Sequence, residues 1–146
     1  MIAIDTNILL AAVETVNPSH ERAAAFLAAL AMKSEVAVSE LVLLELYGLL
    51  RNPQVLSKPV SAHAAAAVCM QFRAHPRWQL LGLPPDGRHF HDALWARLGD
   101  PKLPRRRLYD LRLGLSLVTQ GVTELATVNL KDFQGIGFEK VWDPLA

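Results

Sequence analysis

The chain has 146 residues, of which 51% are hydrophobic and 20% charged, and its formal net charge is +1. This length supports a proper core in a single domain, 1–146, and the composition excludes a disordered chain. A charge this close to neutral does not by itself indicate a nucleic-acid binder. The one cysteine, Cys69, excludes an intrachain disulfide framework.

Apolar runs with strand character alternate with helical patterns along the chain. In chain order we expect a strand at 1–4, helices over 8–13 and 17–34, a strand at 35–38, helices over 40–52 and 61–75, a strand at 78–83, helices over 88–99 and 105–121, a strand at 123–129, a helical turn at 130–133 and a strand at 138–142. Ser39 is the expected N-cap of the third helix. The alternation predicts an α/β fold in which helices cover a parallel sheet.

The first residues, MIAIDTN, contain no basic region and are interrupted by Asp5, so we expect no secretory signal peptide. No apolar run approaches the roughly 18 residues that are needed to cross a bilayer. We therefore expect a cytoplasmic protein without a membrane partner.

Asp5 stands where the first strand is expected to end, ahead of Thr6, Asn7 and an apolar helix. Sites in α/β proteins collect at the carboxyl ends of parallel strands, so Asp5 is a candidate site residue. The alternative is that one of these three residues only caps the following helix. The stretch alone leaves both interpretations open.

Two further carboxylates have apolar neighbours on their helices. Glu45 shares a helical face with Leu41, and its own helix offers it no basic partner. An unpaired buried carboxylate is costly, so Glu45 indicates a metal ion, a basic group from elsewhere or a cleft. Asp110 borders apolar residues on one side, whereas on the other an ordinary helical ion pair with Arg106 or Arg107 is open to it.

Each of these acids has a glycine one turn further along its helix, Gly48 and Gly114. Glycine costs roughly 1 kcal/mol inside a helix, so each one implies close packing or space that is kept open. Space beside a carboxylate is what a hydrated metal ion or a phosphate needs.

Asn129 and Asp132 repeat the pattern of polar residues at the end of a predicted strand, although capping roles remain open for both. Acids from distant segments favour Mg²⁺ or Mn²⁺, because hard cations choose carboxylate oxygen and keep several waters. Zinc is disfavoured, since no cysteine or histidine pair has structural spacing. We expect His89 and His91 to serve as a helix start or loop contacts.

Basic residues concentrate in DPKLPRRRLYDLR, which includes Lys102, Arg105, Arg106, Arg107 and Arg112. Such a patch either neutralises phosphates or is a solvated helix start. The chain has no G-x-S-x-G run and no cysteine–histidine pairing, which argues against covalent hydrolase chemistry. It also lacks a glycine-rich phosphate loop, so a nucleotide cofactor is not indicated.

Three segments, MIAIDTNILL, VSELVLLELYGLLRNP and RRLYDLRLGLSLVTQGVTELATVNLKDF, closely resemble the PIN-domain family and, more narrowly, its VapC-type toxins. The resemblance implies a three-layer α/β/α sandwich with a central, mainly parallel sheet. It implies a Mg²⁺- or Mn²⁺-dependent endoribonuclease that cleaves RNA with a metal-activated water. It further implies that the chain is the toxin of a type II toxin–antitoxin pair, with a VapB-type antitoxin as partner and commonly a toxin homodimer.

By the same resemblance, Asp5, Glu45 and Asp110 match the core acidic residues of the family, as catalytic residues and metal ligands. The family usually has a fourth acid at or just after the strand that reads LATVN here. This chain has Asn129 at that point, and Asp132 follows three residues later.

The resemblance also gives supporting polar roles to Thr6, Asn7 and Thr127. The basic cluster Arg105–Arg107 lies just upstream of Asp110 in sequence, and we expect it to steer RNA toward the acids.

Two alternatives are weighed against this interpretation. A catalytically silent PIN-like module that only binds RNA or protein is kept open by Asn129. An aspartyl-nucleophile phosphatase also begins with an apolar strand and an aspartate, but it normally needs a second aspartate two residues later. That position is Asn7 here, so the phosphatase fits poorly.

Overall fold

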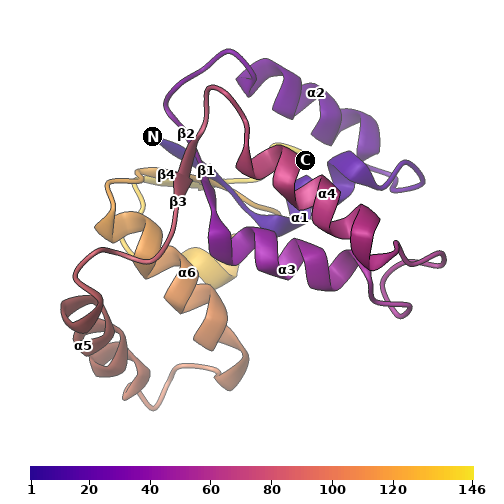
Figure 1. Cartoon of the computed structure of the whole chain (residues 1–146). Coiled ribbons are helices and arrows are strands. Elements are labelled where there is room, and N and C mark those ends of the chain that lie inside the picture. Colours follow the sequence, from indigo (N-terminus) through magenta and orange to yellow (C-terminus); the bar gives the residue numbers. More distant parts are fainter.

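The computed structural model describes all residues, 1–146, and contains a five-stranded parallel sheet between helices (Figure 1). The strands are β1 (Ile2–Ile4), β2 (Val36–Ser39), β3 (Gln79–Leu81), β4 (Glu124–Ala126) and β5 (Lys140–Trp142). Their order across the sheet is β3-β2-β1-β4-β5, and every neighbouring pair is parallel. The predicted α/β architecture with a parallel sheet is confirmed.

Six α-helices flank this sheet. They are α1 (Thr6–Val13), α2 (His20–Leu30), α3 (Glu40–Leu50), α4 (Ala62–Arg73), α5 (Gly87–Leu98) and α6 (Leu108–Thr119), with 3-10 turns η1 (Arg105–Arg107) and η2 (Leu130–Phe133). Helices α1 to α4 pack on one another, and α6 contacts α5 and η2 on the other side of the sheet (Figure 1). None of the helices has the length and apolar character that a membrane crossing requires.

The strand order reverses beside β1. From β1 the chain moves outward to β2 and β3, and it then returns to the other side of β1 to form β4 and β5. In open α/β sheets, ligands bind outside the carboxyl ends of the strands at such a reversal. The residues that directly follow β1 and β4 are Asp5 and Thr127, so the fold brings these two side chains to one crevice.

Buried apolar side chains from the sheet and from both helical layers form one continuous core. The central strands are covered on both faces, which explains why their sequences read as unbroken apolar runs rather than as alternating ones. In β2, for example, Val36, Ala37 and Val38 are all buried. This covered sheet is the rigid base from which the site residues project.

Two helices begin elsewhere than predicted, and local hydrogen bonds give the reason. Helix α1 begins at Thr6 instead of residue 8, because the Asp5 carboxylate accepts a hydrogen bond from the Thr6 backbone N–H at 2.8 Å. The predicted helix over 17–34 is shorter, because the Asn17 side chain accepts from the Ser19 N–H at 2.9 Å and forms a turn instead.

Two later elements are also shorter than predicted. The helix expected over 105–121 is divided into η1 and α6, and it ends before Gly121, whose φ of 90° stops a helix. The strand expected over 123–129 ends at Ala126. Beyond it, the Thr127 hydroxyl accepts from the Asn129 N–H at 3.0 Å and turns the chain.

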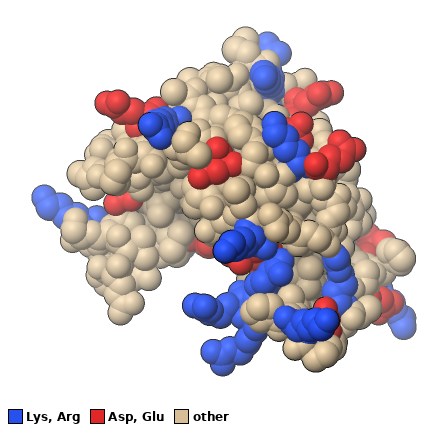
Figure 2. All heavy atoms as spheres, turned by 180° about the vertical axis from the view of Figure 1, so that it is seen from behind, with Lys and Arg blue, Asp and Glu red and all other residues tan.

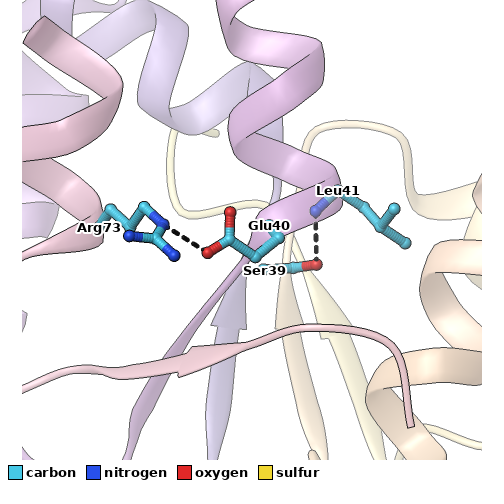
Figure 3. A network of polar contacts seen from close by, with 4 residues as sticks. All are labelled: Ser39, Glu40, Leu41 and Arg73. Atoms are coloured by element: carbon cyan, nitrogen blue, oxygen red, sulfur yellow. Dashed lines mark hydrogen bonds and ion pairs between the residues drawn. The ribbon is translucent and has the colours of Figure 1, made fainter. Parts of the chain in front are cut away.

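The start of α3 is fixed by two contacts (Figure 3). The Ser39 hydroxyl accepts from the Leu41 N–H at 3.1 Å, as expected of an N-cap. The Glu40 carboxylate forms an ion pair with Arg73 of α4 at 2.6 Å, and it is the only ion pair in the structure. These contacts set the position of the helix that carries Glu45.

The two glycines differ in their surroundings, which gives a stability prediction. A Cβ atom on Gly114 would lie 2.7 Å from Ile136 Cδ1, whereas one on Gly48 would have no neighbour within 4 Å. We expect Gly48→Ala to stabilise the protein by about 0.5–1 kcal/mol through helix propensity. Gly114→Ala is expected to be destabilising by about 1 kcal/mol, because overpacking outweighs that gain. Urea unfolding measures both, and a stabilised Gly114→Ala variant would contradict the packing argument.

Candidate active site

Asp5 is buried at the junction of β1 and α1, with 5% of its surface exposed. One carboxylate oxygen caps α1 at Thr6, while the other accepts hydrogen bonds from the Thr127 hydroxyl at 2.6 Å and the Asn7 amide at 3.1 Å. Asp5 therefore caps the helix, and it also lies at the strand-end crevice where the sequence predicts a site residue. Burial raises the pKa of Asp5, although these hydrogen bonds act in the opposite direction.

Asn7 ties the ends of β1 and β4 together. Its amide nitrogen also donates to the Thr127 hydroxyl at 3.3 Å, and its amide oxygen accepts from the Val128 N–H at the same distance. These contacts join residues about 120 positions apart in the chain, and they hold the Asp5 carboxylate in one orientation. Asn7 and Thr127 thus occupy supporting positions around the acid.

Glu45 projects from α3 at the mouth of a cavity and is exposed to solvent. Its carboxylate accepts a hydrogen bond from the Thr6 hydroxyl at 3.2 Å and has no basic partner. Burial and the nearby Asp5 charge raise the pKa of Glu45. Of the three explanations for a carboxylate on this helical face, exposure at a cleft is the one that the structure shows.

Asp110 lies in the first turn of α6 and is half-buried. Burial, followed by the charges of Asp5, Asp132 and Glu45, raises the pKa of Asp110 to about 6, while Arg107 lowers it. The ion pair that Arg106 or Arg107 could have supplied within the helix is not formed. Asp110 therefore keeps its carboxylate free beside three other acids.

Asn129 and Asp132 are the two candidates for the fourth acidic position, which follows β4. Asn129 is exposed, and its side chain makes no capping hydrogen bond to η2. Asp132 is half-buried in η2, close enough for its charge to raise the pKa values of Asp5 and Asp110. The structure thus brings the Asp132 charge close to Asp5 and Asp110, while the Asn129 side chain is exposed and beside Asp132 in a shared cavity.

We call Asp5, Glu45, Asp110 and Asp132 the acidic cluster. No three aspartate, glutamate, histidine or cysteine side chains lie close enough together, as they stand, to ligate one ion directly. The donor set still fits a hard divalent cation, because Mg²⁺ keeps several waters and uses only one or two carboxylates. The charges of the other three acids raise the pKa of Asp110, and none of the four forms an ion pair, so the cluster keeps a net negative charge for a cation to neutralise.

The basic residues upstream of α6 have different roles. Arg107 is partly buried and donates to the backbone carbonyl of Asp132 at 2.7 Å, so its guanidinium holds η2 in place. Arg105 and Arg106 are exposed, and Arg106 lines cavities on both sides of Asp110. Figure 2 shows the molecule from behind relative to Figure 1. Lysine and arginine side chains gather in the lower part of this face, and acidic atoms lie at the edge of the notch above them.

Sequence reasoning missed other side chains that the fold brings to Asp110. Tyr109 and Leu44 line the same cavity as Glu45 and Asp110, together with Arg112, which the sequence places only in the basic patch. An exposed tyrosine next to a candidate acid was the available signal. The two histidines lie on α5 as expected, where His91 Nδ1 is 2.6 Å from the Gly87 carbonyl oxygen.

The raised pKa of Asp110 gives a pH prediction for the metal-free protein. Its folded-state pKa of about 6 exceeds the ordinary 3.8, so the folded protein binds more protons between these values. Stability should therefore fall as pH rises through this window. We expect a higher Tm in EDTA at about pH 5 than at about pH 7.5, and a smaller difference in Asp110→Asn. A Tm that rises with pH across the window in the wild type would contradict the proximity of these acids.

Comparison with known proteins gives consistent results. A sequence model of the PIN domain matches residues 2–76. Over 145 residues the chain is 48% identical to "Ribonuclease VapC24" of Mycobacterium tuberculosis, with the same result for strains H37Rv and CDC 1551. The match covers 99% of this chain and 97% of the relative.

Solved structures with the same fold are more distant in sequence. One is the Mycobacterium tuberculosis toxin VapC20, described as cleaving the Sarcin-Ricin loop, with a TM-score of 0.64, 18% identity and coverage of 94% of this chain and 96% of that one. FitAB bound to an IR36 DNA fragment has a TM-score of 0.64 and 15% identity, and covers 100% and 96%. VapBC2 of Rickettsia felis, bound to a promoter DNA fragment, has a TM-score of 0.62 and 20% identity, and covers 98% and 100%.

Proposed function

Because the chain belongs to the PIN-domain family and is related over nearly its whole length to a VapC ribonuclease, we propose that it is a metal-dependent endoribonuclease, the toxin of a type II toxin–antitoxin pair. The observation that carries the proposal is the acidic cluster. Its four carboxylates come from the end of β1, from α3, from α6 and from η2, and none has a basic partner in an ion pair. A site of this kind suits divalent cations and phosphate chemistry better than it suits a structural role.

Mg²⁺, or Mn²⁺ in its place, is the cofactor in this proposal. Asp5, Glu45 and Asp110 would hold it, one or two of them directly and the others through the waters that the ion keeps, with Asp132 in the fourth acidic position. A bound divalent cation lowers the pKa of water and offsets the negative charge on the scissile phosphate. Asp132 is preferred over Asn129 because its charge reaches Asp5 and Asp110, whereas the Asn129 side chain points to solvent without a partner.

The surrounding residues orient the acids. The Thr127 hydroxyl and the Asn7 amide both donate to the same oxygen of Asp5, so that carboxylate cannot rotate freely. The Thr6 hydroxyl donates to one oxygen of Glu45 and so orients that carboxylate. Partners that orient ligand side chains commonly contribute about 10- to 100-fold to metal affinity or activity.

RNA would approach over the exposed arginines. We expect the double variant Arg105→Gln, Arg106→Gln to bind RNA more weakly, and to lower the slope of log affinity against log salt by about 1.4 for single-stranded RNA, since each phosphate contact contributes about 0.7. The control is Arg51→Gln with Arg77→Gln, which has the same charge change away from the acidic cluster. Equal slopes for the two double variants, measured by fluorescence anisotropy, would remove these arginines from the RNA path.

A cognate VapB-type antitoxin and a second copy of the toxin are the protein partners in this proposal. Support comes from the family and from structural neighbours that are described as FitAB and VapBC2, each bound to a DNA fragment.

The proposal is tested with purified, antitoxin-free protein and a pool of total RNA, in EDTA, Mg²⁺ or Mn²⁺, with cut ends mapped by sequencing. We expect cleavage at a few discrete sites, and only when metal is present. Intact RNA in every lane, from protein shown to be folded, would overturn the nuclease proposal and favour a silent binding module. Cleavage that persists in EDTA would overturn the metal dependence.

A further inference from the structure

A cavity of about 490 Å³ lies between α3 and α6, directly beside two members of the acidic cluster. Its apolar wall includes Leu41, Leu44 and Leu113, while Glu45 and Asp110 lie on its rim. The cavity shares Asp110 and Arg106 with a second one of about 410 Å³, which is also lined by Asp132. The two cavities therefore flank Asp110, and the α3–α6 cavity is the one with an apolar wall.

Two large side chains beside this cavity are left exposed. Tyr109 is 65% exposed and Leu44 is 68% exposed, and they come from α6 and α3 respectively. A single exposed apolar residue is ordinary, but two that line one cavity next to charged groups form a continuous surface. No hydrogen bond is made by the Tyr109 hydroxyl. The side chain is accessible to a ligand, although the Arg112 guanidinium lies near its ring.

Arg112 adds an unpaired positive charge to the same cavity. Its guanidinium lies 5.2 Å from the centroid of the Tyr109 ring, and its Nε is buried without a hydrogen-bond partner. Since the only ion pair in the structure joins Arg73 to Glu40, Arg112 is not neutralised by any carboxylate. Arg106, which lines the cavity too, also has no ion pair. The complementary ligand has a flat apolar part and a negative charge.

We propose that the α3–α6 cavity binds the nucleobase next to the scissile phosphate of a single-stranded RNA segment, with Tyr109 as the stacking surface. Arg112 and Arg106 then face the flanking phosphates. A nucleotide is the ligand that combines a flat apolar ring with an anion, and its base is free to enter a cavity only where the RNA is unpaired. Tyr109 is thereby a substrate-positioning residue that favours unpaired RNA without selecting one base. This inference rests on the proposed ribonuclease function.

The test is an abasic scan of a short single-stranded RNA that the wild-type protein cuts. In the wild type, removal of one base beside the cut should lower kcat/KM by about 10-fold or more, which is the scale of one base–aromatic stack. Tyr109→Ala should lower kcat/KM on the intact RNA by a similar factor and become insensitive to that abasic position. Tyr109→Phe should retain the sensitivity. Trp95→Ala, which removes an aromatic ring that is 70% exposed on α5, is the matched control and should behave as the wild type does.

Other outcomes would overturn either the base-binding cavity or the proposed function. If Tyr109→Ala and the abasic position reduce cleavage independently, or if Tyr109→Ala has no effect, the base-binding cavity is overturned while the ribonuclease proposal stands. If the wild type cuts no RNA with metal present, the proposed function itself fails. If Tyr109→Ala converts a dimer into a monomer in light scattering, a second copy of the chain covers the cavity, and the base-binding proposal is overturned.

Discussion

Asp5→Asn is expected to reduce metal-dependent RNA cleavage by about 1,000-fold or more, since even the loss of a residue that only orients a metal ligand costs about 10- to 100-fold. The fold should survive, because an asparagine oxygen still accepts the capping hydrogen bond from the Thr6 N–H. Initial cleavage rates in Mg²⁺ measure the first effect, and circular dichroism measures the second.

A milder variant separates orientation of Asp5 from its charge. Thr127→Val removes the hydroxyl that donates to Asp5 at 2.6 Å, but it leaves the carboxylate in place. We expect a loss of about 10- to 100-fold in cleavage, between those of the wild type and Asp5→Asn. If Thr127→Val were as inactive as Asp5→Asn, loss of the fold at the crevice would explain both.

Metal binding gives a readout for Asp5 that does not depend on RNA. A ligand that binds only the folded state, at 100 times its Kd, stabilises it by about 2.7 kcal/mol. Mg²⁺ or Mn²⁺ should therefore raise the Tm of the wild type by several degrees, and that rise should be lost in Asp5→Asn. An equal rise in both proteins would contradict the assignment of Asp5 as a ligand.

The sequence predicted the fold and indicated all four members of the acidic cluster, with Asn129 as the alternative to Asp132, for local reasons. Asp5 interrupts an apolar strand at its end, and Glu45 lies on an apolar helical face without a basic partner. Both signals depend on residues within a few positions, where strand and helix periodicity fix the geometry. The parallel sheet followed from the alternation of strands and helices along the chain.

The remaining features depend on packing between distant segments, which periodicity does not determine. The hydrogen bond from Thr127 to Asp5 exists because β4 lies beside β1 in the sheet. Arg107 differs from Arg105 and Arg106 because η2 packs against it and offers a backbone carbonyl. The cavity at Tyr109 requires α3 and α6 to lie opposite each other, and nothing in either helix alone indicates that.

The choice between Asn129 and Asp132 is also a question of distant packing, and it leads to the second large effect. Both residues follow β4, so their positions in sequence do not separate them. The structure turns the chain at Thr127, which leaves the Asn129 side chain in solvent. It also places Asp132 in a turn whose backbone is held by Arg107.

Asp132→Asn is therefore expected to lower RNA cleavage by about 100-fold or more, whereas Asn129→Ala should change it by less than about 3-fold. The physical reason is that the Asp132 charge acts on Asp5 and Asp110, while Asn129 carries no charge and its exposed side chain makes no capping bond. Initial rates in Mg²⁺ and in Mn²⁺ measure the effect, and the Tm shift on adding metal shows whether Asp132 acts through the ion. The opposite result, with Asn129→Ala inactive and Asp132→Asn active, would assign the fourth metal-binding position to Asn129 instead of Asp132. That outcome is sterically open, because the Asn129 N–H bonds the same Thr127 hydroxyl that donates to Asp5.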